Sequence, residues 1–166
     1  MPTDYHSSTE RPASLEEETR TTIEEARMVL PGIQALFGFQ LIAVFNTRFH
    51  DFSSLEQVLH LVALLLVALA IALIMTPAAY HRIAERGIVS RRFVDLASRL
   101  LESALMPLML GISLDLFLLG RLILNNVALS ATIASMMFLV FFGLWYLFPW
   151  TWSVRRVRSE KIKKRS

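Results

Sequence analysis

Long apolar runs alternate with short polar connections along this chain, and the pattern predicts four membrane-spanning helices. A helix needs roughly 20 mostly apolar residues, each rising about 1.5 Å, to cross the hydrocarbon core of a bilayer. The stretches that meet this requirement are about 28–47, 55–79, 103–121 and 127–148. The third is the apolar part of a longer helix that we expect to begin just after Ser90, and Pro149 is expected to stop the fourth. The predicted fold class is therefore all-α: a polytopic membrane protein with a four-helix bundle over residues 28–148.

The N-terminal part of the chain is polar and differs from the runs that follow it. Residues 1–13 contain two prolines and show no apolar period, which is typical of a disordered tail. Ser14 and Glu17 have the spacing of a capping box, so a helix over 14–29 should begin there and lie along the membrane surface. Pro31 is expected to break this helix from the first span or to open a fresh first turn.

The positions of Lys and Arg predict the orientation of the four spans. Basic residues close to a span are retained on the cytoplasmic side of the membrane. The first and third connections hold only Arg48 and Arg121, whereas the second connection and the tail over 149–166 hold clusters of basic residues. Both chain ends are therefore expected in the cytoplasm, and the protein in the cytoplasmic membrane.

Composition agrees with this prediction and removes other classes of protein. Hydrophobic residues make up 54% of the chain, and they cluster in long runs. A water-soluble domain of this length would interleave them with charged residues. Basic residues lie at the ends of those runs and not in a patch with interleaved aromatic residues, so nucleic acid is not an expected partner. The chain has no cysteine, which excludes disulfides, thiolate metal sites and cysteine nucleophiles. We expect no metal and no cofactor, and the acidic, polar N-terminus does not predict a cleaved signal peptide.

Two stretches of the sequence resemble a known family. Residues 30–39 read LPGIQALFGF, and residues 77–82 read PAAYHR. They are similar to a bacterial family of small four-helix membrane proteins of unknown function, and the resemblance extends over about 24–124. It implies a multi-pass protein of a bacterial inner membrane. Some relatives carry the label sodium/proton antiporter, and no catalytic residue set accompanies that label.

The candidate for chemistry inside the membrane is Asp115. It lies in the third span, about seven residues or roughly 10 Å from the outer end of that span. An Asp at the centre of a spanning helix costs roughly 2.5 to 3.5 kcal/mol, so this carboxyl group should face protein or water. It also belongs to a small or polar stripe that suits helix packing, made of Ser103, Pro107, Gly111 and Asp115. Candidate neighbours at the same depth are Gln40, His60, Ser130, Thr132 and Ser135.

Two hypotheses for this polar group stay open. In the first, Asp115, His60 and Gln40 form a site that binds or relays a proton or a cation. In the second, the same residues make a hydrogen bond that locks the packing of the helices. At the cytoplasmic side, His81, Arg82, Arg91 and Arg92 are candidate contacts for anionic lipid headgroups. The alternative there is that they anchor the helix ends at the interface and reflect ordinary retention of positive charge.

Two functional hypotheses from different classes follow. The first is a transporter or channel for protons or small cations, expected as a homo-oligomer because four helices alone enclose little space. The second is a non-transporting scaffold or accessory subunit whose charged N-terminal helix and basic tail bind a cytoplasmic partner or anionic lipid. An enzyme is not expected, because the chain lacks the known catalytic signatures. Only His81 with Glu85, four residues apart, comes near an acid–base pair.

Overall fold

The computed structural model describes residues 15–84 and 90–151. Their elements are α1 (Leu15–Ala43), the 3₁₀ helix η1 (Thr47–Asp51), α2 (Ser54–Ala84), α3 (Arg91–Leu124), α4 (Val127–Phe142) and the π-helical segment η2 (Gly143–Leu147). The described residues thus form an all-helical fold with four helices, each long and apolar enough to cross a membrane. This confirms the predicted all-α class with four candidate spans. Their insertion into a membrane and their orientation stay predictions.

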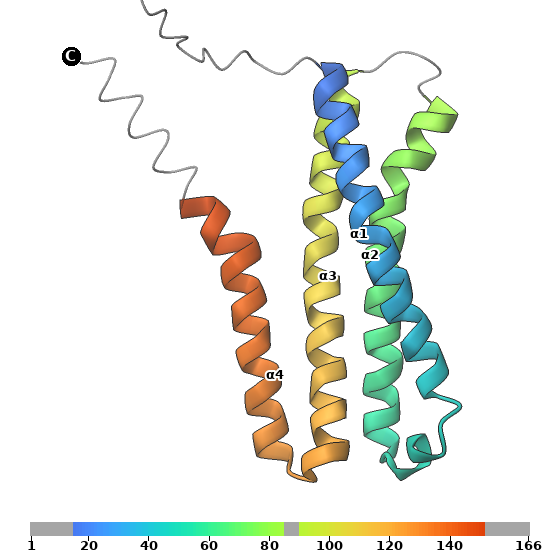
Figure 1. Ribbon diagram of the computed structural model, residues 1–166, viewed down its shortest axis with the longest axis vertical. Coiled ribbons are helices and arrows are strands. Elements are labelled where there is room, and N and C mark those ends of the chain that lie inside the picture. Colours follow the sequence, from blue (N-terminus) through green and yellow to red (C-terminus); the bar gives the residue numbers. More distant parts are fainter. Residues whose placement is uncertain (1–14, 85–89, 152–166) are drawn as a thin grey trace, which may run out of the picture.

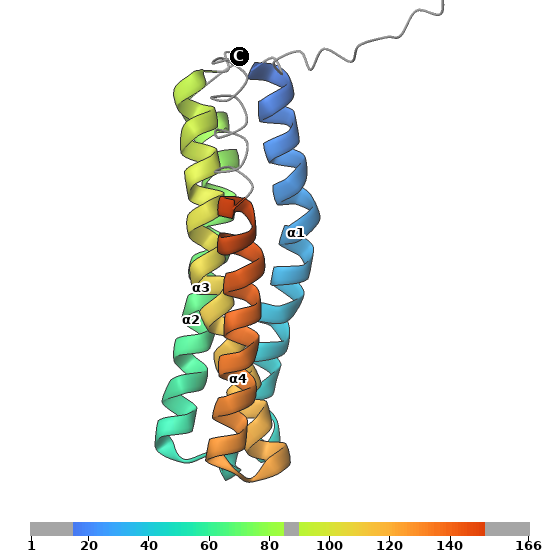
Figure 2. The same cartoon turned by 90° about the vertical axis from the view of Figure 1, so that its left-hand side faces the viewer.

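The four helices run up and down beside one another, as Figure 1 shows. The start of α1, the end of α2 and the start of α3 lie at one end of the bundle, which we call the tail end. The α1–α2 and α3–α4 connections lie at the opposite end, the hairpin end. α4 lies close to α3 at the hairpin end and leans away from it toward the tail end. In the view of Figure 2, α1 stands on one side of the bundle and α2 with α3 on the other.

Side-chain caps fix the ends of α3 and the start of α4. The Ser90 hydroxyl accepts a hydrogen bond from the Phe93 backbone N–H at 3.2 Å, so α3 begins where the sequence predicted. Asn125 closes α3 with a φ of 47°, a left-handed conformation that Asn adopts more readily than most residues. The Asn126 side chain then accepts from the Leu129 N–H and starts α4. Two residues therefore suffice to reverse the chain between α3 and α4.

The expected break at Pro31 is wrong. α1 is one helix from Leu15 to Ala43 with Pro31 inside it, so the helix expected on the membrane surface is continuous with the first span. Proline removes one backbone hydrogen bond and crowds the carbonyl one turn before it. Pro31 is exposed, so neither its ring nor that carbonyl has to fit against a neighbouring helix. The helical turns on both sides are sufficient to carry α1 through this position.

The expected stop at Pro149 is also wrong, because helical geometry continues to Thr151. The turn directly before the proline is η2, in which the Phe148 N–H donates to the Gly143 carbonyl five residues earlier. A π-helical turn is wider than an α-helical one and makes room for the proline ring. The fourth candidate span therefore extends over Val127–Thr151.

Packing is closest in the seam between α2 and α3. On α2, a buried stripe recurs every three or four residues through Ala63, Val67, Ala70 and Ile74. Gly111 of α3 faces it, and a Cβ atom at Gly111 would lie 2.9 Å from Val67 Cγ2 and 3.3 Å from the Ala63 carbonyl oxygen. The two helices thus approach each other at a point where only glycine fits.

The predicted stripe of small residues on α3 is confirmed in its central part. Pro107 and Gly111 are buried, and Asp115 is largely covered, with its side chain 22% exposed. Ser103 is exposed and takes no part in the seam. The outward faces carry large apolar side chains such as Phe45, which is 88% exposed, and Ile83, which is 77% exposed. Such faces suit contact with lipid and not with water.

Several predicted features lie outside the described residues. They are the tail over 1–13, the capping residue Ser14, Glu85 and most of the basic tail over 149–166.

Candidate functional site

Two helix faces bring polar side chains together near the hairpin end. His60 lies on the same stripe of α2 as Ala63 and Val67, one turn nearer the hairpin end. Asp115 lies one turn beyond Gly111 on the face of α3 that meets this stripe. The close α2–α3 seam therefore carries both residues to the same depth, and α1 supplies the third, Gln40.

These three residues, which we call the polar cluster, are in contact. The Gln40 side-chain amide donates from Nε2 to Asp115 Oδ2 at 2.6 Å. His60 Nε2 lies 3.0 Å from the Gln40 backbone carbonyl oxygen, and His60 Nδ1 lies 4.0 Å from Asp115 Oδ1. Of the residues singled out in the sequence, the structure thus brings Gln40, His60 and Asp115 together. Gln40 and His60 are buried, with exposed fractions of 4% and 7%.

The contacts of His60 define its tautomer. A carbonyl oxygen only accepts, so the hydrogen bond to the Gln40 carbonyl places a proton on Nε2. In the neutral ring, Nδ1 is then an acceptor that faces a carboxylate oxygen across 4.0 Å, a gap too long for a direct hydrogen bond. The Phe49 ring packs edge-on against the imidazole, with 5.4 Å between ring centroids, and holds it in place. The structure therefore leaves Nδ1 and Asp115 Oδ1 facing each other without a hydrogen bond between them.

The side-chain oxygen of Gln40 is the second unusual feature of the cluster. Oε1 is buried and accepts no hydrogen bond from any described residue. The amide cannot turn around to relieve this, because Oε1 would then face the carboxylate of Asp115 in place of Nε2. A buried acceptor without a donor costs about 1–3 kcal/mol. The cluster therefore lacks one hydrogen-bond donor.

A cavity of about 380 Å³ lies against the polar cluster, between α1 and α3. Apart from Gln40, His60 and Asp115, its wall is apolar: Leu36, Phe39, Ala43, Phe52, Ile112, Leu116, Leu118, Leu119 and Leu122. Two further cavities share wall residues with it, one through Phe52 and Leu122 and the other through Ala43 and Leu122. Both of these reach Arg48 at the hairpin end. Two neighbouring cavities thus lie on the hairpin side of the cavity at the polar cluster.

An ion pair lies between the polar cluster and the hairpin end. Arg121 Nε is 2.7 Å from Glu56 Oε1, and the two side chains are 22% and 12% exposed. The other carboxylate oxygen, Oε2, accepts from both the Ser53 N–H at 2.9 Å and the Ser53 hydroxyl at 2.8 Å. Glu56 is one turn from His60, and Arg121 is six residues, or about 9 Å, from Asp115. The pair joins α2 to α3 beside the cavities.

Sequence reasoning missed this ion pair. The Ser53-x-x-Glu56 spacing is a capping-box signal that predicts how Glu56 bonds to the start of α2. In the sequence, Arg121 bears only on the orientation of the spans. It lies 65 residues from its partner, Glu56. No local pattern reports that contact.

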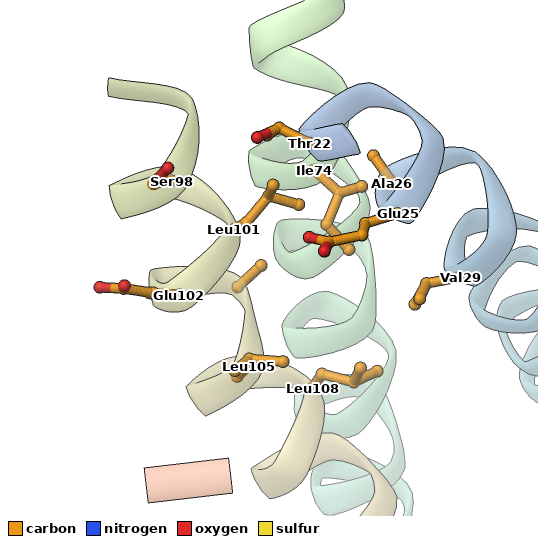
Figure 3. A pocket seen from close by; sticks show the side chains of 11 residues that line it. Thr22, Glu25, Ala26, Val29, Ile74, Ser98, Leu101, Glu102, Leu105 and Leu108 are labelled. Carbon is orange, nitrogen blue, oxygen red and sulfur yellow. The ribbon is translucent and has the colours of Figure 1, made fainter. Parts of the chain in front are cut away.

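A second cavity of about 380 Å³ lies at the tail end, between α1, α2 and α3 (Figure 3). Its wall is mostly apolar, with Glu25 and Glu102 among the lining residues. In Figure 3, Glu25 extends across the cavity whereas Glu102 points away from it. Buried Ile33 lies between the two cavities along α1, in the core cluster that includes Val67 and Leu108. Its polar lining residues are Thr22, Glu25, Ser98 and Glu102.

The basic residues expected to contact lipid headgroups lie at the tail end and form no shared site among the described residues. The His81 ring is 5.4 Å from the Phe93 ring, in a tilted arrangement. Arg91 Nε is 3.6 Å from Asp95 Oδ1, and Arg82 and Arg92 are exposed. Their role in binding anionic lipid stays a prediction.

The polar residues of α4 do not join the polar cluster. Ser130 is fully buried, and its hydroxyl donates to the Asn126 carbonyl of its own helix at 2.7 Å. It packs on Gly120, where a Cβ atom would lie 3.0 Å from the hydroxyl oxygen. Thr132 likewise donates to a carbonyl of α4, and Ser135 is exposed. The hydroxyls of Ser130 and Thr132 therefore bond within α4 and not to the polar cluster.

Fold and site together define a small protein of four helices, each long and apolar enough to cross a membrane, with a polar cluster in its interior. Residues 11–149 match a family described as "Family of unknown function (DUF6328)", and the chain belongs to this family. The match includes all but the last two residues of the fourth candidate span, which the resemblance over 24–124 did not reach. No curated protein and no solved structure matches the chain. Function must therefore be argued from the geometry of the site.

Proposed function

We propose that this protein moves protons or small cations across a membrane, with Asp115, His60 and Gln40 as the binding site. The observation that carries the proposal is the arrangement of the polar cluster beside a cavity. Asp115 Oδ1 and His60 Nδ1 face each other across 4.0 Å, and the buried amide oxygen of Gln40 beside them has no donor among the described residues. Such a group of acceptors attracts a proton or a cation.

The competing explanation is that the cluster only locks the helices together. A hydrogen bond that serves packing is expected to satisfy the buried groups that make it. Here the bond between Gln40 and Asp115 leaves Gln40 Oε1 without a donor and His60 Nδ1 beyond hydrogen-bond distance of the carboxylate. The α2–α3 seam packs closely without this bond, which instead joins α1 to α3. Binding therefore explains the unsatisfied atoms better than packing does.

The cavities support access from the hairpin end. Two cavities that share wall residues with the one at the polar cluster reach Arg48, whereas buried Ile33 and Leu108 lie toward the tail-end cavity. Transport across the whole bilayer then requires α1 to move against α3, so that the apolar contact around Ile33 opens. α1 packs less closely than α2 and carries only Ile33 and Gln40 as buried residues among those with described burial. We place the protein in a cytoplasmic membrane with both ends inside, as a homo-oligomer.

Proton flux into proteoliposomes tests the proposal. The purified protein is reconstituted with an internal pH dye, and a potassium diffusion potential drives proton entry. Asp115→Asn keeps the size of the side chain and its ability to accept from Gln40 but removes the charge. We expect it to lower flux about tenfold or more, as removal of a proton-transferring group does. Asp95→Asn is the matched control, because Asp95 lies on the same helix with its side chain 56% exposed.

Equal flux in the Asp115→Asn and wild-type proteins would remove Asp115 from the mechanism. Absence of flux in every variant, together with a stoichiometric partner in crosslinked native membranes, would favour the scaffold hypothesis instead. Circular dichroism and gel filtration of each variant, performed before reconstitution, separate loss of flux from loss of fold.

A further inference from the structure

We infer that the cavity beside Asp115 takes a primary amine, in its ammonium form, that carries an apolar group. The inference rests on the proposed function, because it assigns the substrate class of the same site. It follows from three properties of the cavity: its volume, its few polar atoms and its apolar mouth.

The volume of the cavity is much larger than an inorganic cation requires. One water molecule takes up about 30 Å³ in the liquid, whereas pockets for small organic molecules measure about 300–1,000 Å³. The cavity of about 380 Å³ belongs to the second class. A bare alkali ion at Asp115 would leave most of an apolar space to be filled by water. An organic body of six to ten carbon atoms would cover that wall.

The polar atoms of the cavity suit an N–H donor better than a bare metal ion. Side-chain oxygens among the described wall residues come from Asp115 and Gln40 alone, and Asp115 Oδ2 already accepts the Gln40 amide. Hard metal cations bind through larger sets of oxygen ligands, about six or more for Ca²⁺ and Mg²⁺. An ammonium group has three donors in a compact head. Asp115 Oδ1 is an acceptor for it at the cavity wall. Gln40 Oε1, which is covered and has no donor among the described residues, becomes a second acceptor when the Gln40 side chain turns toward the bound head.

The mouth of the cavity is apolar and faces outward between α1 and α3. Phe39 is 70% exposed and Leu119 is 53% exposed, one on each helix. If these faces meet lipid, an amphipathic amine can reach the cavity from the bilayer. Phe39 and Phe52 also place aromatic rings on the wall, and aromatic faces attract organic cations. The ammonium head would lie against Asp115 with the apolar body between these rings.

Binding of radiolabelled 2-phenylethylamine to the protein in lipid nanodiscs tests the inference, with binding to empty nanodiscs subtracted. Competitors are sodium chloride and the N-trimethylated analogue of the same amine, which keeps the charge and the apolar body but has no N–H donor. We expect saturable binding that sodium does not displace, with the trimethylated analogue about tenfold weaker, as loss of hydrogen bonds to buried acceptors predicts. Displacement by equimolar sodium, or equal affinity for the two organic cations, would overturn the inference.

Two variants locate the binding. Asp115→Asn should weaken amine binding about tenfold or more, because it removes the charged partner. Gln40→Leu should remove most of the preference for the primary amine over its trimethylated analogue, whereas Gln34→Leu, at an exposed position of the same helix, should keep that preference. An unchanged preference in Gln40→Leu would contradict the assigned role of Oε1.

Proton flux measured on the same preparations separates this inference from the proposed function. If flux depends on Asp115 but the amine does not bind, the substrate class is wrong and the proposed function stands. If the amine binds through Asp115 and also inhibits proton flux, both are supported. If flux is independent of Asp115 and the amine does not bind, both fail.

Discussion

The two seams on either side of the polar cluster are built differently. In the α2–α3 seam, Ala63, Val67 and Ala70 are fully buried, and Gly111 lets the two backbones approach. Between α1 and α3, cavities of about 380 Å³ lie on both sides of the Ile33 contact, and Gln40 reaches Asp115 across one of them. The first seam has no room for another group, and the second does. Helix α3 therefore contributes to close packing through its contact with α2, and the proposed ligand binding involves its contact with α1.

The strongest test of this comparison changes Gly111, because the close seam should tolerate no side chain there. The added Cβ atom of Gly111→Ala would lie 2.9 Å from Val67 Cγ2 and 3.3 Å from a backbone oxygen. We expect a loss of about 2–3 kcal/mol of unfolding free energy, within the range for overpacking. Gly38→Ala on α1 is the control, since its Cβ atom would meet nothing within 4 Å. There, alanine should stabilise the helix by roughly 0.5–1 kcal/mol. Equal effects in chemical unfolding in detergent would contradict the contrast between the seams.

The next largest effect is expected at the Glu56–Arg121 ion pair, which joins α2 to α3 at the hairpin end. Its side chains are 12% and 22% exposed, whereas those of the Arg91–Asp95 pair are 63% and 56% exposed. Arg121→Gln should therefore cost about 1–3 kcal/mol, below the value for a fully buried pair, and Arg91→Gln less than about 0.5 kcal/mol. Glu56→Gln keeps a side chain that can complete the capping box, so a double-mutant cycle with Arg121→Gln isolates the pair. A coupling energy near zero would show that the pair does not join the helices.

Gln40→Leu should have the smallest effect on stability and a large one on flux. The substitution removes the hydrogen bond to Asp115 and also the buried oxygen without a donor, so the two contributions oppose each other. We expect an unfolding free energy within about 1 kcal/mol of wild type. Flux should fall as in Asp115→Asn, whereas Gln34→Leu should leave it unchanged. A large loss of stability in Gln40→Leu would instead assign the bond to packing.

The sequence predicts the four helices well because each is specified locally, by a long apolar run. It also places Asp115, His60 and Gln40 at one depth, since depth follows from counting residues along each span. The path of the backbone past Pro31 and Pro149 was predicted wrongly. Whether a helix continues past a proline depends on where the ring points and on whether a wider turn precedes it. Neither can be predicted from the proline alone.

The details of the site could not be predicted for a different reason. The cavity, the unsatisfied oxygen of Gln40 and the bond from His60 to a backbone carbonyl depend on how three helices rotate and separate. The Glu56–Arg121 pair depends on the same rotations. One signal was available: the spacing of His60, Ala63, Val67 and Ala70 places the histidine on the packed face of α2. That stripe predicts a buried imidazole, but not its partners.

The claim that the polar cluster adjoins an accessible cavity, and not a closed packing contact, is tested most directly by thiol labelling. The natural chain has no cysteine, so single substitutions can be read without background. Leu116→Cys lies in the cavity wall one residue from Asp115, and Leu61→Cys lies at the same depth on α2, where Leu61 is 52% exposed on the outward face. A charged, membrane-impermeant reagent requires a thiolate in contact with water. We predict that it modifies the cavity cysteine at least about tenfold faster than the outward one, a difference of about 1.4 kcal/mol in activation free energy. Equally slow modification of both would contradict the account and leave Asp115 as a packing residue.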